Sequence, residues 1–113
     1  MRPIVQTLSD ASGGALTGNP IPLDVFVSPF NTTLSVQVTG TVNYTVQYTF
    51  DDVFAKDFTP ASANWVDHPS LTAQTATKDS NIAYPVRGVR LNVASGTGTT
   101  RLTIIQAGGG GLA

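Results

Sequence analysis

The sequence predicts an all-β fold, an antiparallel β-sandwich of the jelly-roll or immunoglobulin-like type with an extended N-terminal arm. Residues 41–50 alternate without interruption between large apolar and uncharged polar side chains, which is the pattern of a strand with one buried face. Sixteen threonines and no glutamate favour strands over helices, because β-branched side chains pack well on a pleated surface. A second pair of alternating runs, 86–93 and 101–105, repeats the pattern near the C-terminus.

Length and composition limit the function classes. A chain of 113 residues forms one domain with a core of its own, and the absence of cysteine excludes disulfides and thiolate metal sites. Charged residues make up 12%, against about 25% in a typical protein. So few charges favour a chain whose surfaces meet other protein.

The charge balance and the apolar runs exclude two kinds of partner. The net charge of −1 gives no basic surface for nucleic acid. The N-terminus lacks the pattern of a signal peptide, and no apolar run approaches the roughly 18 residues needed to cross a bilayer. We therefore expect neither a nucleic acid nor a membrane partner.

Three segments are predicted. Residues 1–19 form an N-terminal strand, near Ile4 and Val5, followed by a flexible glycine-containing arm. Residues 20–107 form the sandwich domain, and 108–113 are a glycine-rich tail. Pro20 and Pro22 place the run that follows the arm at a sheet edge, because proline cannot donate a hydrogen bond to a neighbouring strand.

The first alternating strand is expected to form a hairpin with the run before it. A three-residue loop ending at Gly40 would place Val36 opposite Val42 and Leu34 opposite Tyr44. The alternative is a bend at Gly40 that carries the chain from one sheet to the other. In either case glycine suits the left-handed backbone conformation at this position.

A second hairpin is expected from the last third of the chain, with a bulge at Gly88 and a turn within residues 96–99. It would bury Val93 opposite Leu102 and Leu91 opposite Ile104. Its outward face would carry a mixture of arginine and apolar side chains that is typical of protein interfaces. The candidate interface residues are Arg87, Arg90, Asn92, Arg101 and Ile105, together with Ile4 and Val5 of the N-terminal strand.

No combination of residues predicts a reaction centre. His68, the only histidine, lies beside Asp67 in one loop, where neighbouring side chains point apart and cannot form a catalytic triad. Asp51, Asp52 and Asp57 lack the spacing of a calcium loop. We therefore expect no enzymatic activity, no metal site and no cofactor.

Three blocks of sequence resemble the small virion proteins of tailed bacteriophages that decorate, or cement, the head. The blocks are Gly40–Phe54 (GTVNYTVQYTFDDVF), Ala63–Leu71 (ANWVDHPSL) and Asn81–Gly108 (NIAYPVRGVRLNVASGTGTTRLTIIQAG). The resemblance implies a non-enzymatic structural protein, made in the cytoplasm of the bacterial host, that binds the capsid exterior. Its partners would be the major capsid protein and further copies of itself, as a homotrimer. No catalytic or metal-binding residues follow from the resemblance.

Two other functions remain open. The chain would be a carbohydrate-binding module, with Trp65, Tyr84 and Asp67 as ligand-binding residues, or a tail or fibre module of the same virion. A glycan array combined with a Trp65→Ala change separates the first of these from the capsid function.

Overall fold

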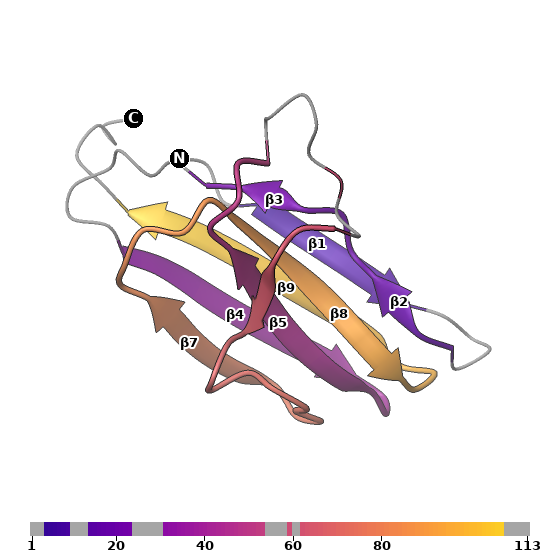
Figure 1. The fold of residues 1–113 in the computed structure, drawn as a ribbon. Coiled ribbons are helices and arrows are strands. Elements are labelled where there is room, and N and C mark those ends of the chain that lie inside the picture. Colours follow the sequence, from indigo (N-terminus) through magenta and orange to yellow (C-terminus); the bar gives the residue numbers. More distant parts are fainter. Residues whose placement is uncertain (1–3, 10–13, 24–30, 54–58, 60–61, 108–113) are drawn as a thin grey trace.

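The computed structural model describes residues 4–9, 14–23, 31–53, 59 and 62–107. Within these ranges the chain is a sandwich of two antiparallel sheets (Figure 1). Sheet A has the strand order β1-β9-β4-β7 and consists of β1 (Ile4–Ser9), β9 (Thr99–Ala107), β4 (Asn31–Thr39) and β7 (Lys78–Ile82). Sheet B has the order β2-β8-β5-β6, with β3 also on β8, and consists of β2 (Leu16–Thr17), β3 (Ile21–Pro22), β8 (Gly88–Ser95), β5 (Asn43–Thr49) and β6 (Trp65–Asp67).

The pairing is nested along the chain. β1 pairs with β9, β2 with β8, β4 with β7 and β5 with β6. Such a chain is one long antiparallel ribbon that has been rolled into two sheets, and rolling it brings β9 beside β4 and β8 beside β5. This is the jelly-roll arrangement, so the connectivity selects it over the immunoglobulin-like alternative.

The predicted first hairpin is wrong, and the bend that was its alternative is what the structure has. β4 lies in sheet A and β5 in sheet B, so Val36 faces Leu102 and Leu34 faces Ile104 in place of the expected partners. Gly40 makes the crossing with φ +88°, the left-handed conformation expected for it. The inward residues of the two runs therefore meet across the core and not along one sheet.

The predicted second hairpin is wrong for the same reason. β8 and β9 belong to different sheets, so Leu91 pairs with Val46 and Val93 with Tyr44. The chain crosses between the sheets at Gly96, whose φ is +115°. The expected bulge at Gly88 is also absent: Gly88 is in register with Thr49, and the shift in this ladder lies at Asn43/Tyr44.

The two crossings lie side by side and are joined by a backbone hydrogen bond. The amide of Gly98 donates to the carbonyl of Thr41 at 3.0 Å. A Cβ added at Gly96 would approach Thr41 O to 2.3 Å, and one at Gly98 would approach Thr39 O to 2.4 Å. The glycines that suggested hairpin turns are thus needed because two backbones pass within contact distance.

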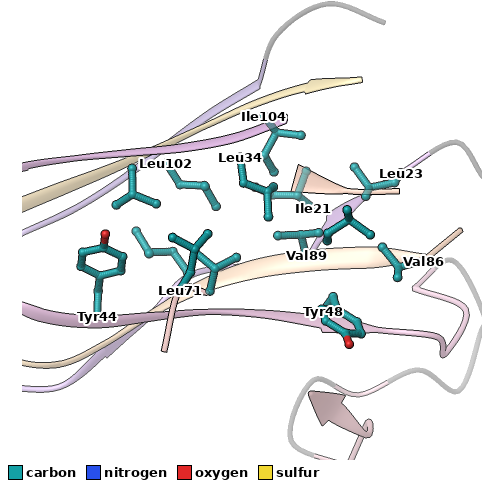
Figure 2. Close-up of a cluster of buried hydrophobic side chains, with 14 of the residues drawn as sticks. Ile21, Leu23, Leu34, Tyr44, Tyr48, Leu71, Val86, Val89, Leu102 and Ile104 are labelled. Atoms are coloured by element: carbon teal, nitrogen blue, oxygen red, sulfur yellow. The ribbon is translucent and has the colours of Figure 1, made fainter. Parts of the chain in front are cut away.

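The core fills the space between the sheets. Figure 2 shows Leu102 and Ile104 of sheet A meeting Tyr44 and Val89 of sheet B in this layer. The even positions of the opening strand are buried as expected, except that Phe50, just past β5, is 56% exposed. Thr32 and Thr100 also point into the core, and within the described residues their hydroxyls have no hydrogen-bond partner.

The run Asp79, Ser80 and Asn81 has the composition of a turn, but it is part of strand β7. Pairing with β4 overrides the local preference, and side chains reinforce it. Ser35 Oγ donates to Asp79 Oδ1 at 2.9 Å, and Asn81 Nδ2 donates to Asn31 Oδ1 at 3.1 Å. β7 is therefore an edge strand with a polar outer face.

The N-terminal segment contributes to both sheets. The strand predicted near Ile4 is β1, the other edge of sheet A, and Leu16–Thr17 pairs with β8 in sheet B. Residues 1–3, 10–13 and the glycine-rich tail at 108–113 lie outside the described residues. Within the described part of the expected arm, Leu16–Thr17 is thus a strand of the sandwich itself.

Candidate interaction surfaces

The candidate interface residues do not lie on one face. Arg101, Ile105 and Val5 lie on the outer face of sheet A, whereas Arg90 and Asn92 lie on the outer face of sheet B, between the buried residues of β8. The expected single patch required the β8–β9 hairpin, and the crossing at Gly96 separates its two halves. Two further positions also differ from expectation. Ile4 points inward against the core, and Arg87 precedes β8 and pairs with Asp52 at 3.4 Å.

The outer face of sheet A has an apolar centre. Val5 is directly opposite Thr103 in the β1–β9 ladder, so it is diagonal to both Arg101 and Ile105. Diagonal neighbours on one face lie about 7–8 Å apart, within reach of long side chains. Val5 is 46% exposed and Ile105 44%. We call Val5, Arg101, Thr103 and Ile105 the sheet A patch.

Hydroxyl and amide side chains surround the sheet A patch. The alternation of β1, β4 and β9 places on the same face Thr7, Ser9, Asn31, Thr33, Ser35, Gln37, Thr39 and Thr99. The charged members among the described residues of this face are Arg101 and, on β7, Asp79. Burying such a face against another protein desolvates few charges, which suits a protein interface.

The outer face of sheet B carries an ordered polar network. Gln47 of β5 lies between Arg90 of β8 and Asp67 of β6 in the ladder. Arg90 Nε donates to Gln47 Oε1 at 2.8 Å, and Gln47 Nε2 donates to Asp67 Oδ1 at 2.9 Å. The Arg90 guanidinium also lies over the Trp65 ring, 4.1 Å from its centroid. We call Gln47, Trp65, Asp67 and Arg90 the sheet B cluster.

The electrostatics of the sheet B cluster follow from its packing. Partial burial lowers the pKa of Arg90, because the charged guanidinium has lost part of its hydration. The indole face and the Gln47 carbonyl partly replace that hydration. Within the described part of the chain, the terminal nitrogens of Arg90 and Asp67 Oδ2 have no hydrogen-bond partner.

The predicted ligand-binding trio is only partly brought together. Trp65 and Asp67 share the outer face of sheet B, but Tyr84 contacts Tyr48, which points inward. Tyr84 Oη donates to Tyr48 Oη at 2.9 Å, and the rings lie 5.8 Å apart at 72°. This hydrogen bond, with burial second, raises the pKa of Tyr84 to about 12. Tyr84 therefore belongs to an aromatic cluster at the end of the core.

His68 has a structural environment. It is buried, its Nδ1 accepts the amide of Ser70 at 3.1 Å, and its Nε2 lies 3.0 Å from the carbonyl of Asn81. An accepting Nδ1 leaves the proton on Nε2, which donates to Asn81. His68 thus joins the loop after β6 to β7 in the opposite sheet. It closes its own turn by accepting the amide of Ser70.

The described residues form neither a metal-binding group nor a membrane-spanning helix. The described residues contain no group of three or more His, Cys, Asp or Glu side chains placed to hold a metal ion. Asp51, weighed above as a calcium ligand, accepts the amide of Asn64 through Oδ2 at 2.8 Å, and Asp57 lies outside the described residues. None of the described segments is a helix long and apolar enough to cross a membrane.

No family model matches the sequence, and no curated protein is similar to it. Functional inference therefore depends on the two outer faces.

Gln47 is a site residue that the sequence pattern placed on the polar face of residues 41–50 but that was not among the candidate site residues. A signal for it existed, because Gln47 is the longest side chain in the polar row of β5. Gln47 can bridge Arg90 and Asp67 only because β8 and β6 flank β5. The sequence pattern alone does not give this order of strands. The clustering of Val5 with Ile105 also required the β1–β9 register.

Proposed function

We propose that this chain is a non-enzymatic structural protein of a tailed-phage virion that binds the outside of the capsid and holds neighbouring subunits together. The observation that carries the proposal is the sheet A patch, where Val5 and Ile105 are exposed side by side on an almost uncharged face. Exposed apolar groups of this kind mark protein contacts, and arginine at their edge tolerates desolvation better than lysine.

Two further points support this function. The three sequence blocks that resemble head decoration proteins include β5, β6, β8 and β9, the strands that supply the sheet B cluster and, from sheet A, Arg101, Thr103 and Ile105. The jelly roll is also used by viral capsid proteins and by lectins, which is an analogy of fold only.

The physical mechanism is stabilisation by binding. A protein that binds the assembled lattice and not its separated subunits shifts the equilibrium toward the lattice. We propose that the chain acts as a homotrimer, because several weak contacts made at once by a symmetric oligomer give a strong attachment.

Immunogold labelling tests the location. An antibody against the chain is applied to purified virions of the phage that encodes it. The proposal predicts a regular array of label over the outside of the head. Label restricted to the tail or fibres, or virions that lack the chain, would contradict it.

A further inference from the structure

The sheet B cluster has no role in the proposed capsid contact, because it lies on the opposite side of the sandwich from the sheet A patch. Its residues come from three adjacent strands, β8, β5 and β6, and are ordered by one shared side chain. The Gln47 carbonyl accepts from Arg90, and its NH2 group donates to Asp67. One side chain therefore holds both the donor group of Arg90 and the acceptor group of Asp67 in place.

The cluster presents one donor group, one acceptor and one ring. The Arg90 Nε donates to Gln47 and the guanidinium lies over the Trp65 ring, so this donor group is fixed while its terminal nitrogens make no hydrogen bond within the described residues. Asp67 is exposed and offers Oδ2 as an acceptor. Trp65 is half-buried, so part of the indole remains in contact with solvent. Such pre-ordered groups bind a ligand at a lower entropic cost.

We infer that the sheet B cluster is a binding site for a neutral oligosaccharide. A pyranose ring has an apolar face of C–H groups, which packs on an indole, and hydroxyls that both donate and accept. Arg90 would donate to one hydroxyl and the Asp67 carboxylate would accept from another, with the sugar ring against the part of the indole that the Arg90 guanidinium leaves uncovered. Asn92, whose Oδ1 accepts from Thr17 at 3.1 Å, extends the polar row toward β2.

The charge of the cluster argues for a neutral ligand over an anionic one. Gln47 donates to Asp67 and accepts from Arg90, so the same side chain holds the carboxylate and the guanidinium. An acidic sugar or a phosphate that bound Arg90 would be repelled by Asp67. A hydroxyl pair satisfies both groups without that repulsion.

The single tryptophan gives a direct measurement of binding. Because the chain contains one Trp, any change in indole emission on ligand addition reports on Trp65. A printed array of neutral and acidic glycans is probed with the intact protein, and the neutral glycans that bind are titrated while Trp65 fluorescence is followed. We expect a saturable change in emission and no binding to acidic glycans of the same backbone.

Variants separate recognition from folding. Asp67→Asn keeps an oxygen for Gln47 but removes the charged acceptor, and Arg90→Lys keeps the charge but removes the planar donor group and its stacking. Each is expected to weaken binding at least tenfold while the variant stays folded, which a cooperative thermal unfolding transition verifies. Arg101→Lys on the opposite face is the matched control and is expected to bind as the wild type does.

Three results would overturn the inference. The first is an array on which no neutral glycan binds. The second is binding that leaves Trp65 emission unchanged, and the third is binding that persists in both Asp67→Asn and Arg90→Lys. None of these outcomes bears on capsid attachment, which is measured through the sheet A patch.

Discussion

Gln6 Oε1 accepts a hydrogen bond from the amide of Leu91 at 3.0 Å, which links edge strand β1 of sheet A to β8 of sheet B. The same side chain donates from Nε2 to the carbonyl of Asn19 at 2.8 Å. Between β2 and β3 no strand pairs with β8. The Gln6 side-chain amide therefore makes the hydrogen bond to Leu91 that the backbone of a neighbouring strand would otherwise make. Gly18 permits this, because a Cβ there would lie 2.1 Å from Gln6 Oε1.

Gly18→Ala is expected to destabilise the protein by displacing the Gln6 amide. The buried Leu91 amide then lacks its partner, which costs about 1–3 kcal/mol. In a Gln6→Ala background the same glycine change should cost clearly less, since the displaced group is already gone. Urea unfolding of the four proteins of this cycle measures the coupling. Strictly additive effects would show that Gly18 and Gln6 act independently.

Gly96→Ala tests the stacked crossings. The added methyl group would meet the carbonyl of Thr41, at a φ of +115° that side chains rarely adopt. We expect a loss of about 3 kcal/mol or more, because backbone strain and a backbone clash combine. The neighbouring exposed change Ser95→Ala is the control and should cost under about 0.5 kcal/mol. Equal melting temperatures for the two variants would exclude close packing of the crossings.

Thr100→Val is expected to stabilise the protein. Thr100 is fully buried, and its hydroxyl has no hydrogen-bond partner among the described residues. Replacing the hydroxyl by a methyl group removes a desolvation cost of about 1 kcal/mol while the shape is kept. Thr103→Val, on the outer face, should change stability little. A destabilised Thr100→Val would mean that the hydroxyl does have a partner.

Tyr84 makes stability depend on alkaline pH. The folded protein raises the pKa of Tyr84 to about 12, so the folded state holds this proton more tightly than the unfolded chain. The contribution is complete below the unfolded pKa of about 10 and is lost as the pH rises toward 12. Tyr84→Phe should therefore lose less stability between pH 9 and about 12 than the wild type, measured by urea midpoints.

The Tyr84→Phe variant is still expected to lose some stability at alkaline pH. Burial, and secondarily the charge of Asp79, also raises the pKa of Tyr44. The pKa of Tyr44 shifts in the same direction as that of Tyr84. Ionisation of Tyr44 therefore destabilises the folded state at high pH in both proteins. Identical alkaline profiles for the wild type and Tyr84→Phe would contradict the Tyr84–Tyr48 hydrogen bond.

The sequence was sufficient to predict which side chains are buried, because alternation depends only on the period of a strand. Val42, Tyr44, Val46 and Tyr48 are buried, as are the inward apolar residues of the last two strands, Val89, Leu91, Val93, Leu102 and Ile104. Alternation does not say whether two inward faces meet within one sheet or across a core. That ambiguity produced two predicted hairpins where the chain has two crossings.

The sites were harder to predict, because they depend on neighbours that are distant in sequence. The sheet A patch joins β1 to β9, and the sheet B cluster joins β8, β5 and β6. Single residues such as Ile105 and Trp65 were recognised from their type. Their partners followed only from the nested pairing of the jelly roll.

Rebinding to stripped capsids tests the central claim most directly. Wild type, Ile105→Lys and Ala94→Lys, an exposed change on the opposite sheet, are added to capsids from which the chain has been removed, and bound protein is measured after sedimentation. The account predicts that wild type and Ala94→Lys rebind and raise the heat resistance of the capsid, whereas folded Ile105→Lys does neither. Equal rebinding of Ile105→Lys, or no rebinding by the wild type, would contradict a capsid contact through the sheet A patch.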